Sequence, residues 1–224
     1  IRRRGYTPEA IRAFCDAIGV AKANSQIGMD QLEYFVRDDL KDKVESRMVI
    51  LHPLKVTITN YPEGKTEQLT AINNPENEAD GTHTIEFGRE IWIERDDFMK
   101  ETEKKFMRLA PGKEVRLKNA YIIKCDEEHP CDEDADGRIT TIYCTYDPES
   151  RSGMPGASRK IKGKTLHWVN CQDAVPAEVR LYDHLWKVEN PRDEMASIRS
   201  EQQCDAITAM KQIINENSLR ILRQ

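Results

Sequence analysis

The chain has 224 residues, 38% of them hydrophobic and 33% charged, with a formal net charge of -5 and a mean hydropathy of -0.70. This composition excludes an intrinsically disordered chain, because apolar residues recur throughout, and no apolar run reaches the roughly 20 residues that a membrane helix needs. The six cysteines lack the dense spacing of a secreted disulfide scaffold, so we expect a soluble protein with reduced thiols in the cytoplasm.

The first 46 residues are predicted to form a small helical unit. Thr7-Pro8-Glu9 supplies a capping hydroxyl, a proline at the first helical position and an acid near the helix N-terminus, and Gly19 ends the apolar repeat. Asp30 and Glu33 have the spacing of a capping box, in which each side chain bonds the backbone amide of the other residue. This pattern predicts a second helix that is capped by Asp30.

Beyond His52 the apolar period changes from helical to alternating. Leu54, Val56 and Ile58 alternate with polar residues, which is typical of a half-buried strand. Further strand-like stretches occur at 83–88, 90–95, 113–125, 138–147, 164–170 and 177–188. Short strands separated by turn residues, without helices between them, predict an antiparallel barrel or sandwich. A helix is expected at 193–214 and a further strand at 218–224.

The segment 125–144 contains residue types that are common in metal sites. An Asp-x-Asp-x-Asp-Gly run starts at Asp132 like a calcium loop, but its twelfth position is Tyr143 rather than an acid, and strands are expected on both sides. A zinc site would need a second, properly spaced pair of ligands. We therefore predict a hairpin with a solvated acidic loop and assign no metal ligand, with a calcium- or zinc-dependent module as the alternative.

No catalytic motif occurs in the chain. Phosphate loops, nucleophile elbows, dinucleotide-binding fingerprints and metalloprotease motifs are all missing, and the five histidines are dispersed. We assign no catalytic residue.

Positive charge is concentrated in two segments. Residues 104–124 contain seven lysines and arginines with one acid, and residues 151–164 contain five with none. In the expected strand, Val115 and Leu117 face one way, so Arg116 and Lys118 face the other. Such a row of cations can follow a nucleic-acid backbone. An ordinary charged solvent face is the alternative, and periodicity alone favours it.

Several long blocks resemble the region of glutaminyl-tRNA synthetase that follows its catalytic domain. The blocks are RRRGYTPEAIRAFCDAIGVAKANS, LEYFVRDDL, REIWIERDDF, RLAPGKEVRLKNAYIIKC, ITTIYCTYD and KGKTLHWV. They follow the family's order over essentially the whole chain. In this family an ATP-binding Rossmann domain precedes the first block, so we expect Ile1 to be a cut point within a longer protein.

The resemblance implies a mainly β fold with a small helical N-terminal subdomain. Residues 1–46 would be this subdomain, which joins the catalytic domain. Residues 47–188 would be the anticodon-binding barrel region. Residues 189–224 would be a helical insertion and the start of the return into a second, incomplete barrel. Both barrels would be antiparallel and of the ribosomal 5S RNA-binding type.

The resemblance also implies roles for individual cations in binding the anticodon loop of tRNA-Gln. Arg47 corresponds to an arginine that contacts the middle anticodon base, and Arg108 to one that recognises the third base. Arg116 and Lys118 correspond to cations near the first base and its phosphates, where Lys118 replaces a commoner arginine. Unpaired RNA bases are usually splayed into such pockets.

Lys105 and Lys113 are additional candidates for RNA contacts. The family's enzymes attach glutamine to tRNA with ATP and Mg, so we expect this chain to be a tRNA-binding, non-catalytic segment of such an enzyme. We also expect it to be monomeric, to have no cofactor of its own and not to bind membranes. Two alternatives are a ribosomal protein of the same barrel type that binds rRNA, and a glutamyl-specific or non-discriminating synthetase.

Overall fold

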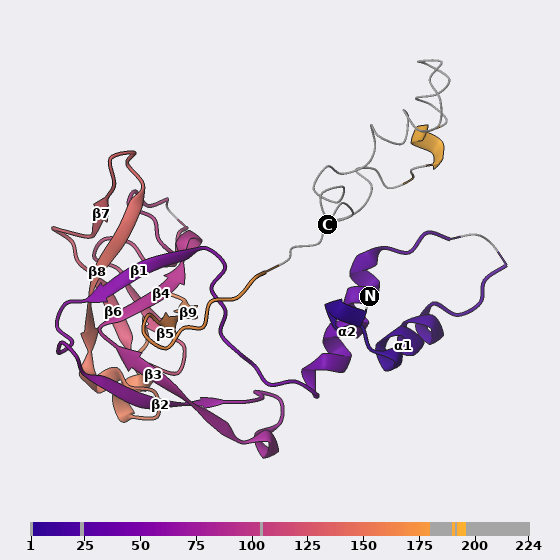
Figure 1. The fold of residues 1–224 in the computed structure, drawn as a ribbon, viewed down its shortest axis with the longest axis horizontal. Helices are drawn as coiled ribbons and strands as arrows, with labels where there is room; N and C mark the ends of the chain where they lie inside the picture. Colours follow the sequence, from indigo (N-terminus) through magenta and orange to yellow (C-terminus); the bar gives the residue numbers. More distant parts are fainter. Residues whose placement is uncertain (1, 23–24, 104, 180–189, 191, 196–224) are drawn as a thin grey trace. The chain divides into compact units, whose positions relative to one another are not determined.

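The computed structural model describes residues 2–22, 25–103, 105–179, 190 and 192–195 (Figure 1). The chain divides into two compact units, 1–175 and 176–224, and the elements described below belong to the first unit. Most of the strand expected at 177–188 and of the helix expected at 193–214, and all of the strand expected at 218–224, lie outside the described residues. None of the described helices is long and apolar enough to cross a membrane.

Two helices, α1 (Pro8–Ile18) and α2 (Met29–Lys41), pack against each other. The start of α1 is as predicted, because Thr7 Oγ1 accepts a hydrogen bond from the amide of Ala10 at 3.1 Å. The helix pair buries a small cluster of its own. Its members are Tyr6, Ala10 and Val36, with Ile11, Leu32 and Leu40 partly buried around them.

The predicted capping box of the second helix is wrong. α2 begins at Met29, two residues earlier than a helix capped by Asp30 would, and its N-cap is Gly28, which makes no side-chain capping bond. Asp30 therefore lies inside the first turn and cannot act as the cap. Glu33 instead accepts a hydrogen bond from the Arg4 guanidinium at 3.2 Å, which ties the start of the chain to α2.

Within the described residues, ten strands follow the helices, and the prediction of a mainly β chain with helices near its start is confirmed. They are β1 (Pro53–Ile58), β2 (Thr66–Ile72), β3 (Thr82–Gly88), β4 (Glu90–Glu94), β5 (Glu114–Leu117), β6 (Ile122–Cys125), β7 (Cys131–Glu133), β8 (Ile139–Asp147), β9 (Thr165–Leu166) and β10 (Val169–Asn170). β2 is not among the predicted strands, because its alternation rests on only two buried residues, Leu69 and Ala71.

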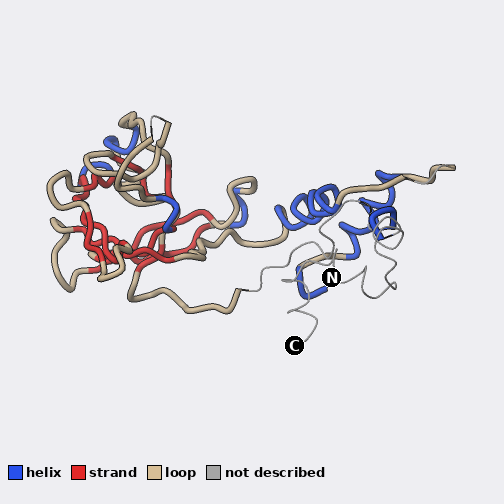
Figure 2. Tube along the Cα trace, turned by 90° about the horizontal axis from the view of Figure 1, so that it is seen from above, coloured by secondary structure: helices blue, strands red, loops and turns tan. Residues whose placement is uncertain are grey.

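The main sheet has the order β10-β4-β1-β8-β6-β5-β9, with β7 added to β8, while β2 and β3 form a separate ribbon. Figure 2 shows the strands in red. The outermost strands, β10 and β9, are separated in the chain by only His167 and Trp168. The sheet is therefore curled so far that one short segment supplies both of its edges. The single strand expected at 164–170 is thus two short strands that pair with different partners.

The prediction of a purely antiparallel sheet is wrong at two pairs. β1 lies parallel to β8, with Val56 opposite Ile142, and β5 lies parallel to β9, with Leu117 opposite Leu166. Parallel neighbours need long connections, and here the intervening strands provide them. All other pairings in the sheet are antiparallel.

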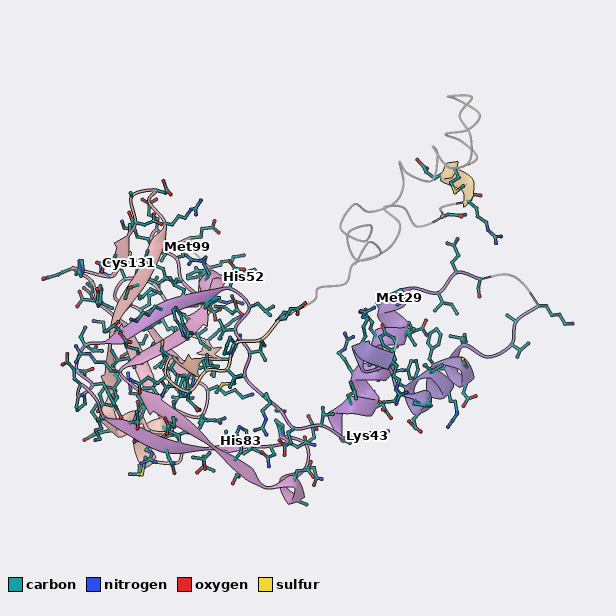
Figure 3. The ribbon with its side chains drawn as sticks, in the orientation of Figure 1. Met29, Lys43, His52, His83, Met99 and Cys131 are labelled. Carbon is teal, nitrogen blue, oxygen red and sulfur yellow. The ribbon has the colours of Figure 1, made fainter. Side chains whose placement is uncertain are left out.

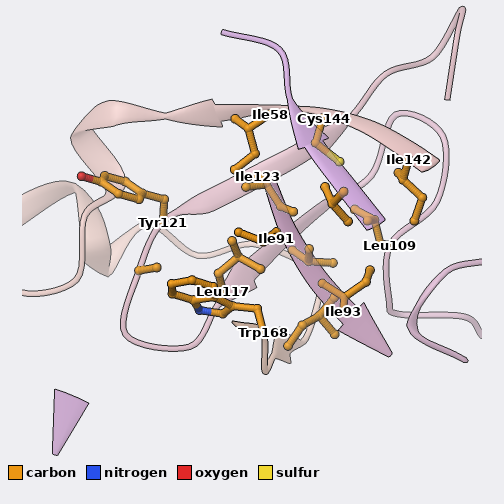
Figure 4. Close-up of a cluster of buried hydrophobic side chains, with 14 of the residues drawn as sticks. Ile58, Ile91, Ile93, Leu109, Leu117, Tyr121, Ile123, Ile142, Cys144 and Trp168 are labelled. Carbon is orange, nitrogen blue, oxygen red and sulfur yellow. The ribbon is translucent and has the colours of Figure 1, made fainter. Parts of the chain in front are cut away.

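The core lies inside the curled sheet (Figure 4). Leu54, Val56 and Ile58 are at most 1% exposed, which confirms the alternation predicted for the first strand. Aromatic rings fill one part of the core, where Phe87 meets Trp168 edge to face with their ring centroids 5.3 Å apart. The indole Nε1 of Trp168 donates to the carbonyl of Lys118 at 2.9 Å, so the ring is held at its polar edge too.

Replacing Trp168 by alanine should lower the free energy of unfolding by ~3–5 kcal/mol, because it opens a cavity where the sheet edges meet. Chemical denaturation followed by circular dichroism measures this loss. Met154 is 55% exposed, so its replacement by alanine is the control and should change stability by no more than about 0.5 kcal/mol. Equal effects of the two substitutions would contradict the closing role of Trp168.

Candidate nucleic-acid interface

The cation row on β5 has the predicted alternation. Val115 and Leu117 are fully buried, Arg116 is half-buried, and Lys118 is exposed just after the strand ends. Arg116 Nη2 donates to the carbonyl of Arg159 at 3.0 Å. Both cations therefore lie on the outer face of the strand, and Lys118 has no ion-pair partner among the described residues.

Lys118 and Arg47 come together at a hollow of about 420 Å³ on the wall of the sheet. The hollow is lined by Arg47, Met48, Val49, Lys118, Thr165, Leu166 and His167. Its rim carries cationic side chains, whereas Met48, Val49 and Leu166 give it an apolar surface. The amide of Lys118 donates to the carbonyl of Leu166 at 2.8 Å, which fixes one wall of the hollow.

Glu94, at the end of β4, holds the chain that carries Arg47. Its carboxylate accepts hydrogen bonds from the amides of Leu51, at 2.6 Å, and His52, at 3.0 Å (His52 is labelled in Figure 3). Burial alone would raise the pKa of Glu94, but these two donors, together with the nearby imidazoles of His167 and His52, more than offset it, so the pKa lies below its ordinary value of 4.5. Arg47 itself forms an ion pair with Glu45.

Arg108 does not line the hollow, but it is paired with a buried carboxylate. Its Nη1 lies 2.7 Å from Oδ1 of Asp97, and the Asp97 side chain is only 6% exposed while that of Arg108 is 44% exposed. Burial raises the pKa of Asp97 above its ordinary value of 3.8, although the Arg108 guanidinium counteracts part of that shift. Arg108 is thus fixed at one end and open to solvent at the other.

The two additional candidates differ from each other. Lys113 donates to the carbonyl of Phe106 at 3.0 Å, and its Nζ lies 5.9 Å from the centre of the Phe106 ring, so it is tied to its own loop. Lys105 is exposed and has no recorded partner in the described part of the chain. Neither residue lines the hollow.

His167 is a lining residue that the sequence interpretation missed. The sequence predicts one strand at 164–170 without assigning a role to His167, yet its neighbours Leu166 and Trp168 are buried, and His167 itself lines the hollow. Its Nε2 lies 3.8 Å from Oε1 of Glu94. The signal was present as an alternation of apolar and polar residues, but over so short a stretch it could not be separated from ordinary packing.

The acidic segment 125–144 has the predicted hairpin, since β6 and β8 are antiparallel neighbours. β7 (Cys131 is labelled in Figure 3) adds a short strand within the connection, also paired with β8. Asp134 Oδ1 accepts from the amides of Asp136 and Arg138, which shapes the turn. Among the described residues, no group of three or more His, Cys, Asp or Glu side chains is arranged to hold a metal ion.

Domains that bind single-stranded nucleic acid commonly place cations along a groove, and this hollow has two cations, Arg47 and Lys118, in its lining. Residues 46–147 match the family described as "tRNA synthetases class I (E and Q), anti-codon binding domain", and residues 165–224 match a second model with the same description. The chain belongs to this family of anticodon-binding domains of class I tRNA synthetases.

Curated relatives named glutamine–tRNA ligase cover most of the chain. Those of Clostridium perfringens and Clostridium kluyveri are 51% and 53% identical to it over 185 residues, which are 83% of this chain and 33% of each relative. That of Rhodopirellula baltica is 52% identical over 191 residues, which are 85% of this chain and 31% of the relative. The chain spans about a third of the length of the curated relatives it matches.

Replacing Arg108 by alanine should destabilise the fold by ~1–3 kcal/mol at neutral pH, because the buried Asp97 carboxylate loses its partner. Without Arg108 the pKa of Asp97 rises further. A carboxyl whose pKa is raised in the folded state stabilises the fold below its unfolded pKa, and this stabilisation is lost as the pH rises through the folded value. The loss relative to wild type should therefore be greater at pH 7 than at pH 4.

Urea unfolding of both proteins at the two pH values measures this difference. Lys118→Ala is the control, because Lys118 is exposed and has no ion-pair partner among the described residues, so its removal should change stability by no more than about 0.5 kcal/mol at either pH. A pH-independent loss for Arg108→Ala would argue against the ion pair with Asp97.

Proposed function

We propose that this chain recognises the anticodon loop of a glutamine tRNA, as part of an enzyme that joins glutamine to that tRNA with ATP and Mg. The observation that carries the proposal is the hollow at which Arg47 and Lys118 meet over apolar side chains, in a chain whose family is described by anticodon binding. The names of the relatives support glutamine as the amino acid, although the family description covers both glutamate and glutamine enzymes (E and Q).

The hollow suits an unpaired base better than a paired one. The faces of a splayed base can contact Met48, Val49 and Leu166, while the cations at the rim meet its polar edge or its phosphate. In this proposal Arg47 contacts the middle anticodon base, and Lys118, with Arg116, serves the first base and its phosphates.

Arg108 serves the third base in this proposal, outside the hollow. Its fork of donors suits a base edge with two acceptors. Lys105 and Lys113 are further cations that can meet the phosphate backbone. Lys105 is the better placed of the two, because Lys113 already donates to Phe106.

In this proposal, the attachment of glutamine to the tRNA takes place in another part of the protein. Residues 1–46 would join a catalytic domain that binds ATP. Residues 47–188 would be the first of two barrels of the ribosomal 5S RNA-binding type, with 189–224 leading into the second. The chain itself would bind tRNA as a monomer in the cytoplasm, without a cofactor and without catalysing a reaction.

The proposal predicts that binding depends on the decoding triplet. Equilibrium binding is measured for a hairpin that copies the anticodon arm of a glutamine tRNA, and for three hairpins that each carry one changed anticodon base. Arg108→Ala should cost ~1–3 kcal/mol of discrimination at one base only. Arg138→Ala, in the acidic hairpin, is the matched control. Equal binding of all four hairpins by the wild type would overturn the proposal.

Lys118 should contribute mainly to the salt-dependent part of the affinity. Lys118→Gln should weaken binding to all four hairpins by a similar factor and reduce the slope of log affinity against log salt by about one, because one phosphate contact is lost. A titration series in potassium chloride measures this slope. Lys100→Gln is the control, since Lys100 is paired with Glu133 at 2.7 Å, and it should leave the slope unchanged.

A further inference from the structure

We propose that Asp97 is a positioning residue for anticodon recognition: it fixes the orientation of the Arg108 guanidinium and so determines which base edge that side chain can read. The inference rests on the proposed function. It goes beyond the cations themselves, because the Asp97 side chain is only 6% exposed and so acts through Arg108.

Asp97 holds the Arg108 loop by both its side chain and its backbone. Its Oδ1 lies 2.7 Å from Arg108 Nη1, and its carbonyl accepts a hydrogen bond from the amide of Leu109 at 3.0 Å. The same Nη1 also donates to the carbonyl of Asp96 at 3.3 Å. Three acceptor oxygens from two consecutive acids thus hold the Arg108 guanidinium and the amide of Leu109.

The anchor beneath Asp97 belongs to the core. Phe98 and Leu109 form an isolated parallel bridge, and the amide of Met99 donates to the carbonyl of Leu109 at 3.2 Å. Leu109 is fully buried and Phe98 is 7% exposed, both within the main hydrophobic cluster. The backbone beside Asp97 is therefore anchored in the core, which gives the Arg108 guanidinium a fixed point to pair with.

The remaining donors of Arg108 are left for a ligand. A guanidinium has five N–H donors in one plane, and reading a base edge with two of them requires that this plane be fixed. Only Nη1 is engaged, and Nε and Nη2 have no acceptor among the residues that the structure describes. Holding one end of the fork in advance reduces the side-chain entropy that RNA binding would otherwise remove.

A purely stabilising ion pair would have a different form. An arginine that serves only to neutralise a buried carboxylate can engage that carboxylate with two of its nitrogens. Arg159, by comparison, donates from both of its terminal nitrogens to Glu114, at 2.9 and 3.1 Å. The pairing of Arg108 uses one nitrogen and leaves the rest of the fork free, as base readout requires.

The test uses the same four hairpins with wild type, Asp97→Asn, Arg108→Ala and the double variant. Asparagine has nearly the shape of aspartate but no charge, so the guanidinium loses its ionic partner. We expect Asp97→Asn to reduce discrimination at the Arg108 base by at least about fivefold, the low end of a bidentate contact. Discrimination at the other two bases should stay within about twofold, and the double variant should lose no more than Arg108→Ala alone.

Asp96→Asn is the matched control, because it removes the same charge one residue away and keeps the backbone carbonyl that Arg108 contacts. It should leave discrimination unchanged. Circular dichroism checks that each variant is folded at the assay temperature. If Asp97→Asn does not fold, Asp97→Glu replaces it, since that variant keeps the charge but moves the carboxylate by one methylene group.

The outcomes separate this inference from the proposed function. If the wild type binds all hairpins equally, the proposed function fails. If the wild type discriminates and the Asp97 variant does so equally well, or if Asp96→Asn causes the same loss, only the positioning role is overturned. Tighter binding of all hairpins by Asp97→Asn would also overturn it, because Asp97 would then compete with RNA for Arg108.

Discussion

The structure depends on the segment 165–170, which pairs with both edges of the curled sheet. Leu166 pairs with β5 on one side, and Val169 pairs with β4 on the other. Trp168 fills the space between them, with its ring against Phe87 and its indole nitrogen on the carbonyl of Lys118. Because the same segment forms a wall of the hollow, the pairing that closes the sheet also forms the candidate site.

Two acids near the end of β4 hold in place the segments that carry Arg47 and Arg108. Glu94 bonds the amides that precede β1, and Asp97 bonds the Arg108 guanidinium. Both carboxylates point toward segments that carry arginines, and neither is well exposed. The candidate interface therefore combines solvent-exposed cations with carboxylates that are mostly shielded from solvent, so its net charge cannot be judged from the number of lysines and arginines alone.

Much of the fold could be predicted from the sequence, because burial imposes a period. The alternation of Leu54, Val56 and Ile58 and the cap at Thr7 are local signals, and both are confirmed. The parallel pair of β1 and β8 and the splitting of 164–170 could not be predicted, since they depend on which distant strand lies alongside. For the same reason each candidate cation could be identified from the sequence alone. That Arg47 and Lys118 line the same hollow, and that Arg108 pairs with Asp97, could be seen only in the structure.

The parallel pairing of β1 with β8, and of β5 with β9, has a consequence for how the chain reaches its final form. Contacts between segments far apart in the sequence close long loops and so form slowly, late in folding. During synthesis, Arg47 leaves the ribosome long before Thr165 and Leu166 are made. Affinity for a ligand in the hollow would thus arise only after nearly all of the sheet has been assembled, and partly folded intermediates would lack it.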